Sequence, residues 1–387
     1  MNLNASTTTL SRQDLLMQMM PIWLCFISLG IIWSPGIIIG YISSDLEFSN
    51  LQLLLLNLPY FLCLLLLPLP ETRLIRRVGH KNVIMSSLLL WIISLAVLAS
   101  DLYYIYPVIV STFFLMAIAT TLMLTSLYSL VATLNSKETL PSALSFVQAL
   151  VPLAAATVPL LFDGATKVMI PTFGFGWRIM FVLFTVIAMF AFSVLGATPH
   201  SSFQNNEVTS TKDIQTLLAS GSVRRGLLAI GLITGTNLIA LLLTVNVTSF
   251  LIFQAIGLFI GGMLLKNVSP LKLSYPAITI QLLGIILLWI GGSDIIDNLS
   301  FVLIGFSNAP LFAIVLSLLF TKHPNNKYAV TALTVTATSI GVLLLTVAIL
   351  MIDSFGETAA YLILLASTLL IMGCLGAEKF SVSEPRQ

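Results

Sequence analysis

Charge is what this sequence has least of. Only 8% of its 387 residues are Asp, Glu, Lys or Arg, and the formal net charge is +2. Soluble proteins contain about 25% charged residues, so these few charges are too scarce to cover a water-exposed surface. The small net charge also speaks against a nucleic-acid partner. Hydrophobic residues instead make up 58% of the chain, which indicates an integral membrane protein.

Cysteine and histidine are also scarce. The three cysteines, Cys25, Cys63 and Cys374, all lie in apolar runs, so a disulfide framework is not expected. The three histidines, His80 among them, fall in polar segments between the runs or at their edges. We find no metal-ligand cluster, nucleotide-binding glycine loop or nucleophile motif. The sequence therefore predicts no metal, no cofactor and no enzymatic activity.

Twelve apolar runs divide the chain. A helix needs about 20 mostly apolar residues to cross a bilayer. The runs lie at 17–42, 51–70, 82–100, 104–133, 140–162, 178–197, 226–244, 247–265, 274–291, 299–320, 328–352 and 358–377. They predict an all-α membrane protein with twelve transmembrane helices.

The positive charges provide an independent check on this number. Lys and Arg accumulate on the cytoplasmic side of membrane proteins. With a cytoplasmic amino terminus and twelve spans, Lys167 and Arg178 are the only two of the seventeen Lys and Arg residues placed outside. An error of one span would destroy this asymmetry. We therefore expect a multi-pass protein of the cell membrane with both termini in the cytoplasm.

The longest polar stretch between spans lies near the middle of the chain, at residues 198–226. It predicts two six-helix bundles joined by a cytoplasmic linker. The expected divisions are an N-terminal segment at 1–16, a first bundle at 17–197, a linker at 198–225, a second bundle at 226–377 and a tail at 378–387. A weak repeat supports them, because "LIRRVGHK" (74–81) and "LLKNVSPLK" (264–272) each follow the second span of a half. Parallel repeats of six helices occur in transporters.

Two segments of the first half carry a family resemblance. In residues 42–84 the pattern consists of Asp45, Leu46, Ser49, Tyr60, Arg77, Gly79 and Lys81, and in "GFGWRIMFVLF" (174–184) it consists of Gly176, Trp177, Arg178 and Phe181. These residues resemble the major facilitator superfamily, most closely its multidrug-efflux, drug:proton antiporter branch. The resemblance implies the major facilitator fold, export of lipophilic compounds and gating by the basic loop "LIRRVGHKNV". The candidate gating residues are Arg76, Arg77, Gly79, Lys81, Trp177 and Arg178. An alternative is that this loop only fixes topology, as basic loops do.

The sequence also departs from the family pattern. Arg76 stands where the family loop has an Asp, and Ala154, Ala155 and Ala156 replace glycines of the fifth helix. The first span has no acid, and the fourth has no base. Part of the expected gating and coupling equipment is therefore missing.

Ionisable residues are nearly absent from the predicted spans. A charge at the centre of a span costs about 2.5–3.5 kcal/mol on insertion scales, so charges that persist there usually have a function. Asp163, near the outer end of the fifth span, is the exception, and Glu138 lies at the cytoplasmic end of that span. These two are the candidates for proton coupling. Asp163 and Arg178 are both predicted at the outer face and could instead form a structural pair.

Neutral polar residues lie inside the spans. The candidates for substrate binding are Asn57, Tyr60, Gln148, Asn237, Asn308 and Thr334. Ser142, Ser145 and Gln148 recur every three residues and share one helical face. Such residues can also hold helices together, and that alternative stays open for each of them. Gly257 and Gly261, four residues apart, predict close helix packing.

These patterns predict a secondary transporter in which two bundles rock around a small lipophilic or neutral solute. The expected partners are the solute and the bilayer, with two alternatives for coupling: a proton carried by groups at the span edges, or facilitated diffusion without a proton. The expected state is a monomer. An alternative is a transporter-like protein that has lost transport and acts as a sensor or partner subunit. A membrane enzyme ranks last, because no catalytic cluster is visible.

Overall fold

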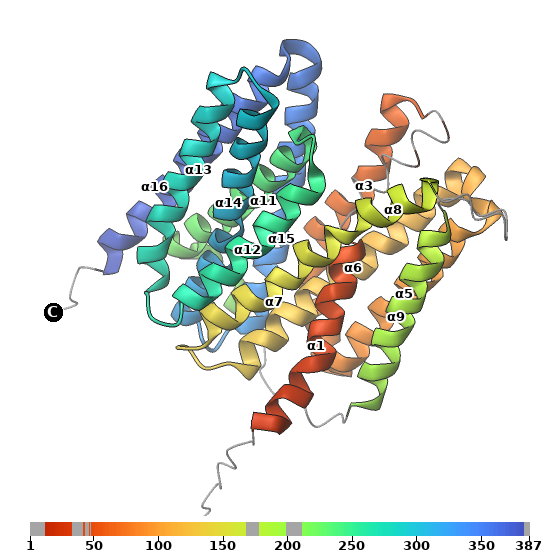
Figure 1. Cartoon of the computed structure of the whole chain (residues 1–387). Helices are drawn as coiled ribbons and strands as arrows, with labels where there is room; N and C mark the ends of the chain where they lie inside the picture. Colours follow the sequence, from red (N-terminus) through yellow and green to blue (C-terminus); the bar gives the residue numbers. More distant parts are fainter. Residues whose placement is uncertain are drawn as a thin grey trace, which may run out of the picture.

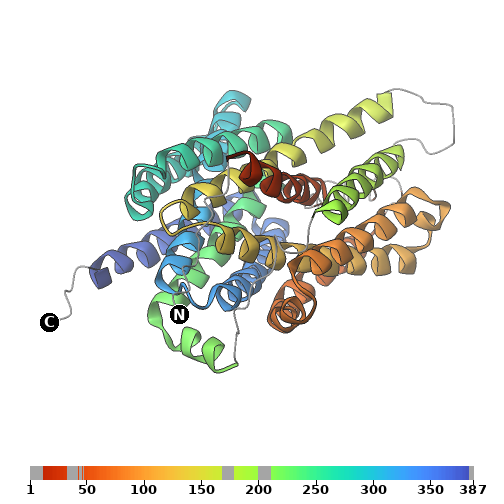
Figure 2. The same cartoon turned by 90° about the horizontal axis from the view of Figure 1, so that it is seen from below.

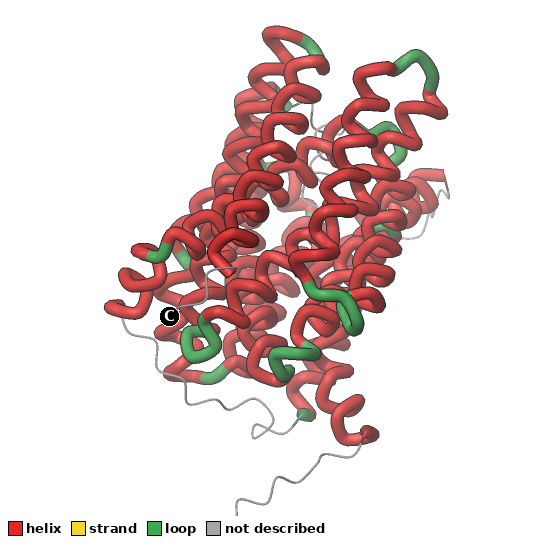
Figure 3. The backbone as a smooth tube through the Cα atoms, turned by 90° about the vertical axis from the view of Figure 1, so that its left-hand side faces the viewer, coloured by secondary structure: helices red, strands yellow, loops and turns green. Residues whose placement is uncertain are grey.

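Helices make up nearly all of the described chain (Figure 3). The computed structural model describes residues 12–32, 42, 46, 48–167, 178–198 and 211–382. The first half contains α1 (Arg12–Ile32), α3 (Asn50–Leu66), α4 (Pro68–Val78), α5 (His80–Ala99), the 3₁₀ turn η1 (Asp101–Tyr104), α6 (Tyr106–Leu134), α7 (Leu140–Ala155), α8 (Thr157–Lys167) and α9 (Ile179–Ala197). After α10 (Thr211–Ala219), the second half contains α11 (Gly221–Leu243), α12 (Val247–Leu264), α13 (Pro270–Ile290), α14 (Asp294–Lys322), α15 (Lys327–Phe355) and α16 (Glu357–Val382).

The helices form twelve membrane spans in two bundles of six. Within the described residues, ten segments are long and apolar enough to cross a membrane, and the shorter apolar helices Met19–Ile31 and Leu55–Leu66 complete the set. Figure 1 shows the two bundles side by side, with the first half in red to yellow-green and the second in green to blue. The predicted all-α fold with twelve spans is confirmed.

Proline bends one span of the first half. Leu67, between α3 and α4, has helical dihedral angles of −82° and −32°. Pro68 and Pro70 have no backbone N–H, so they interrupt the helical hydrogen bonds without ending the helix. α3 and α4 are therefore one span, and it begins at Ser49 with a capping box. The Gln52 N–H donates to Ser49 Oγ at 3.4 Å, and the Ser49 N–H donates to Gln52 Oε1 at 2.9 Å.

The described chain begins and ends at one end of the bundle, the lower end in Figure 1. We call it the terminus-side end. It contains Gly79 and the connections 135–139, 265–269 and 323–326. Figure 2 views the molecule from this end. The opposite end contains η1 and the connections 244–246 and 291–293.

The segment "LIRRVGHKNV" corrects a prediction. It was expected to be a loop, but only Gly79 interrupts the helices, because α4 runs to Val78 and α5 begins at His80. Gly79 has φ +83°, a conformation that glycine adopts without steric strain. A helix satisfies its own backbone hydrogen bonds, so it can continue past the apolar run while its Arg side chains reach water.

Glycines allow close helix contacts in both halves. A Cβ atom at Gly257 on α12 would overlap the carbonyl group of Phe306 on α14. A Cβ atom at Gly30 on α1 would overlap that of Val151 on α7. Gly261 lies against Pro310, so the predicted close packing at Gly257 and Gly261 is confirmed.

Candidate substrate and gating site

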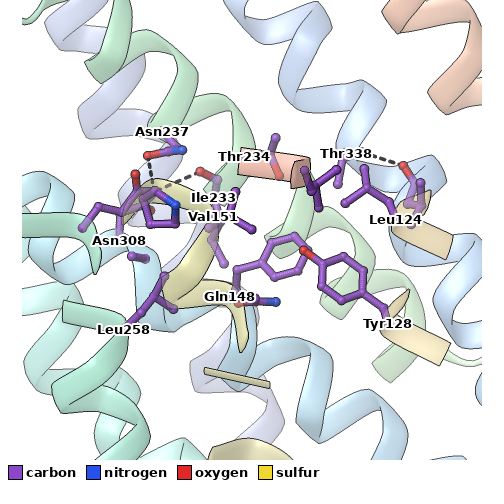
Figure 4. A pocket seen from close by; sticks show the side chains of 16 residues that line it. Leu124, Tyr128, Gln148, Val151, Ile233, Thr234, Asn237, Leu258, Asn308 and Thr338 are labelled. Atoms are coloured by element: carbon purple, nitrogen blue, oxygen red, sulfur yellow. Dashed lines mark hydrogen bonds between the residues drawn. The ribbon is translucent and has the colours of Figure 1, made fainter. Parts of the chain in front are cut away.

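A cavity of about 120 Å³ lies between the two halves (Figure 4). It is lined by α1, α6 and α7 of the first half and by α11, α12, α14 and α15 of the second. The lining residues are Leu29, Leu124, Tyr128, Gln148, Val151, Pro152, Ile233, Thr234, Asn237, Gln254, Leu258, Asn308, Ala309, Phe312, Val335 and Thr338. Every one of these side chains is uncharged.

Four amide side chains provide most of the polar lining. Gln254 Nε2 donates to Asn237 Oδ1 at 2.9 Å, and Asn308 Nδ2 donates to the Ile233 carbonyl at 3.0 Å. Among the described residues, Gln148 Nε2 and Asn308 Oδ1 have no hydrogen-bond partner. An unsatisfied buried polar group costs about 1–3 kcal/mol. One donor and one acceptor are therefore available to a bound molecule.

Aromatic rings close the cavity toward the terminus-side end. Tyr128 and Phe312 are the lining residues closest to that end on α6 and α14. Their ring centroids lie 5.8 Å apart, so the pair joins the two halves. Phe26 of α1 packs behind Tyr128 with a centroid distance of 6.0 Å. The cavity therefore combines an aromatic floor with amide walls.

Half of the predicted substrate residues come together here. Gln148, Asn237 and Asn308 line the cavity. Asn57, Tyr60 and Thr334 do not. Tyr60 is buried against Phe113, with an edge-on ring contact of 6.5 Å. Thr334 is fully buried.

Gln254 and Tyr128, two polar residues of the lining, were not among the predicted candidates. Gln254 is a lone amide in the apolar run "SFLIFQAIGLF", and that signal was available in the sequence. Tyr128 gave no comparable signal, because the chain contains nine tyrosines. Only the facing helix α14 distinguishes it from a lipid-facing or core tyrosine.

The polar stripe of α7 has two roles. Ser142 Oγ donates to the Gly262 carbonyl at 2.7 Å, and Ser145 Oγ donates to the Leu258 carbonyl at 2.9 Å. Both acceptors lie on α12, so these serines hold the halves together. Gln148, at the next position of the stripe, lines the cavity instead.

The predicted gating residues of α4 and α5 differ in exposure. Arg76 and Arg77 are exposed on α4. Lys81 is buried, and its Nζ donates to the carbonyls of Gly196 at 2.8 Å and Thr198 at 2.6 Å. These acceptors lie at the end of α9, where helix carbonyls lack partners within the helix. Lys81 therefore links α5 to α9 within the first half.

Arg178 makes contacts at the opposite end. Its Nη1 donates to the Ser100 carbonyl at 3.0 Å, and its guanidinium lies 5.4 Å from the Tyr104 ring centroid. These contacts attach the start of α9 to the end of α5. Trp177 and the side chain of Asp163 lie outside the described residues.

Glu138, the second coupling candidate, is exposed in the connection between α6 and α7. Its hydrogen bond with Ser136 is the main reason that its pKa is lowered from the usual value. Glu138 is thus charged at neutral pH. The Glu138 side chain is therefore not packed between the membrane-spanning helices.

The sequence did not reveal a contact between the halves that lies next to Gly79. His80, expected in a loop or at its edge, is buried as the first residue of α5. Its Nε2 lies 3.0 Å from Tyr328 Oη of α15, and the two rings stack at 5.2 Å with an interplanar angle of 16°. Nearby, Lys327 Nζ donates to the Ala132 carbonyl at 2.8 Å. These contacts close the two halves against each other at the terminus-side end.

Glu71 corrects the prediction that Asp163 is the only ionisable residue inside a span. It lies one residue beyond the predicted end of the second span, but it is only 3% exposed. The apolar run stops at residue 70, whereas the helix continues to Val78 and packs against α5, α6 and α15. Burial here comes from neighbouring helices, which the local sequence does not show.

Comparisons with known proteins agree with this architecture. The model of the Major Facilitator Superfamily matches residues 22–377. The transporter FucP in the outward conformation is similar with a TM-score of 0.76 and 15% identity, over 93% of this chain and 98% of that chain. The proton:xylose symporter XylE bound to 6-bromo-6-deoxy-D-glucose is similar with a TM-score of 0.73 and 14% identity, over 95% of this chain and 96% of that chain. The human organic anion transporter MFSD10 (TETRAN) is similar with a TM-score of 0.66 and 14% identity, over 94% of this chain and 99% of that chain.

At these identities, the likeness to solved structures is one of fold. No curated protein sequence matches the chain significantly. The family match, which spans nearly all of the twelve helices, carries more information. This chain belongs to the Major Facilitator Superfamily and is a multi-pass membrane transporter rather than an enzyme.

Proposed function

We propose that this protein moves a small neutral or lipophilic solute across the membrane by alternating access between its two halves. The observation that carries the proposal is the uncharged cavity between the bundles, with its amide walls and aromatic floor. An anionic or cationic solute would enter this site without a counter-charge, which is unfavourable at low dielectric. A neutral solute has no such penalty.

The size of the cavity favours a small solute. Its volume is about 120 Å³, whereas sites for drug-sized ligands enclose about 300–1,000 Å³. Gln148 Nε2 would donate to the solute, and Asn308 Oδ1 would accept from it. Tyr128 and Phe312 would cover its apolar face. Asn57, Tyr60 and Thr334 are proposed to contact the solute in another state of the cycle.

We further propose efflux as the direction, because the motif around Arg77, Gly79 and Lys81 resembles that of drug exporters. The exposed Arg76 and Arg77, together with Trp177 and Arg178, are proposed to act in gating. A coupling proton is part of the same proposal, with Asp163 and Glu138 as the carboxyl groups named from sequence. We place both termini in the cytoplasm and treat the monomer as the transporting unit.

Uptake by proteoliposomes tests the proposal. The protein is reconstituted and offered a panel of small neutral and lipophilic solutes, with and without a pH gradient. Gln148→Ala and Asn237→Ala should each raise KM about tenfold, as expected for the loss of a hydrogen bond worth about 1–1.5 kcal/mol. Gln281→Ala is the matched control, since Gln281 is a buried amide bonded to Thr368 at 3.0 Å, away from the cavity. It should leave KM unchanged.

Three outcomes decide between the alternatives. A rise in KM with normal yield of folded protein supports the cavity as the binding site. Loss of folded protein in both variants would mean that these amides hold helices together. No transport of any solute by folded wild-type protein would favour the transport-inactive sensor or partner subunit.

A further inference from the structure

Glu71 is a buried carboxyl group outside the solute cavity. It lies in the first turn of α4 and is 3% exposed. Ser126 Oγ of α6 donates to Glu71 Oε1 at 3.2 Å, and Thr125 also faces the carboxyl group. Glu71 Oε2 has no hydrogen-bond partner among the described residues. Two hydroxyl groups are thus its polar surroundings.

The cations on the neighbouring helices are engaged elsewhere. Lys81 of α5 bonds to carbonyls of the α9 end, and Lys327 of α15 bonds to the Ala132 carbonyl. His80 of α5 and Tyr328 of α15 contact each other. Tyr128 of α6 lies at the solute cavity, and Tyr106 of α6 and Asp353 of α15 lie toward the opposite end of the bundle. Arg73, Arg76 and Arg77 of α4 itself are exposed. Within the described chain, no ion pair with Glu71 is formed.

An ionised carboxylate at this position would lack both a counter-ion and bulk water. The penalty for burying an unpaired charge is large enough that such a group is held in its neutral form. The Ser126 hydroxyl would offset part of the penalty once the group ionises. The site therefore suits a carboxyl group that gains and loses a proton.

Glu71 is also positioned to sense the contact between the halves. Ser126, which bonds to Glu71, also presents its backbone to the His80 ring. His80 in turn stacks on Tyr328 of the second half. Movement of α15 away from α4, α5 and α6 would remove the cover over this cluster and admit water from the terminus-side end.

We propose that Glu71 is a proton-binding site of this transporter, whose proton is retained while α15 packs against α4–α6 and is released when that packing opens. On release, the carboxyl O–H bond breaks, the proton passes to water, and the carboxylate keeps the Ser126 hydrogen bond. Rebinding of a proton restores the neutral group and favours closure. Coupling of this proton to solute movement rests on the proposed function; proton binding itself does not.

Pulsed electron spin distance measurements test the site without any solute. Spin labels are placed at Lys137→Cys and Asn325→Cys, two exposed positions on opposite halves of the terminus-side end. Cys374 is replaced by Ser, since the other two cysteines are buried. The distance in the otherwise wild-type protein should lengthen as the pH rises from 5 to 9. Glu71→Gln, which mimics the neutral group, should keep the short distance throughout.

Asp353→Asn, at an exposed carboxyl group near the opposite end of α15, is the control and should keep the wild-type response. Ser126→Ala removes the donor to the carboxylate and should move the midpoint of the response upward by about one pH unit. If Glu71→Gln fails to fold, the midpoint shift in Ser126→Ala tests the proposal in its place. A wild-type distance that ignores pH, or the same response in Glu71→Gln as in the wild type, overturns the proposal, as does a response abolished by Asp353→Asn alone.

Transport assays then separate this inference from the proposed function. Glu71→Gln should lose stimulation of uptake by a pH gradient and keep solute exchange at equal pH. If no solute is transported at all, the proposed function fails, while the spin distances still report whether Glu71 binds a proton. Gradient-stimulated uptake that survives in Glu71→Gln would overturn its role in coupling.

Discussion

The connections that follow the second span of each half resemble each other in sequence but differ in structure. In the first half, the segment 74–83 turns at Gly79 and buries both His80 and Lys81. In the second half, Lys266 in the connection 265–269 and Lys272 in the first turn of α13 are both exposed. Similar basic composition therefore serves a packed contact in one half and a surface turn in the other.

Both connections nevertheless reach the opposite half. His80 stacks on Tyr328 and lies within hydrogen-bond distance of its hydroxyl. Lys266 Nζ lies 5.3 Å from the ring centroid of Phe146 on α7. The first contact is buried and the second is open to solvent, where cation–π attraction is weak. Burial, rather than charge, should determine how much each contact stabilises the closed terminus-side end.

The largest expected difference concerns the two lysines. Lys81→Met removes two charge-assisted hydrogen bonds and leaves the α9 carbonyls unsatisfied, so it should destabilise the protein by about 2–3 kcal/mol. Lys272→Met, at an exposed position, should change stability by less than about 0.5 kcal/mol. Thermal unfolding in detergent measures both. Equal melting temperatures for the two variants would show that the buried Lys81 hydrogen bonds do not stabilise the protein more than an exposed lysine does.

The ring contact comes next in size. His80→Ala removes both the stacking and the hydrogen bond with Tyr328 and should weaken the closed terminus-side contact by about 2 kcal/mol. Tyr328→Phe keeps the stacking and should lose about half of that. The spin distance between positions 137 and 325 at constant pH reports the closed population. A larger effect of Tyr328→Phe than of His80→Ala would contradict this ranking.

The solvent-exposed contact of the second half should contribute less. Lys266→Ala removes the cation over Phe146 and should weaken closure by about 0.5–1 kcal/mol. The effect should shrink at high salt, unlike that of His80→Ala. A Lys266→Ala effect as large as that of His80→Ala would remove the distinction between the two connections.

Arg77, one of three exposed arginines on α4, should have the smallest effect on stability. Arg77→Ala should change the melting temperature little, since exposed substitutions stay within about 0.5 kcal/mol. If Arg77 acts in gating, kcat should fall while KM stays constant. Unchanged turnover in proteoliposomes would remove Arg77 from the gating set and leave His80 and Tyr328 as the contact to examine.

Much of the fold could be predicted because its signals are local. Twelve apolar runs of about 20 residues and the one-sided distribution of Lys and Arg need no knowledge of neighbouring helices. The amides of Gln148, Asn237 and Asn308 were also recognisable, since a lone amide in an apolar run is costly to leave in lipid. The structure brings these three amides together in one cavity.

The remaining features depended on which helices pack together. His80 and Glu71 looked like loop residues, because the apolar runs end beside them and their partners are distant. Tyr328 lies 248 residues from His80, and Ser126 lies 55 residues from Glu71. The sequence by itself determined the number and positions of the spans, because each apolar run partitions into lipid independently. Tertiary structure alone decided which polar groups are buried, because burial is a property of the facing helix as well as of the residue itself.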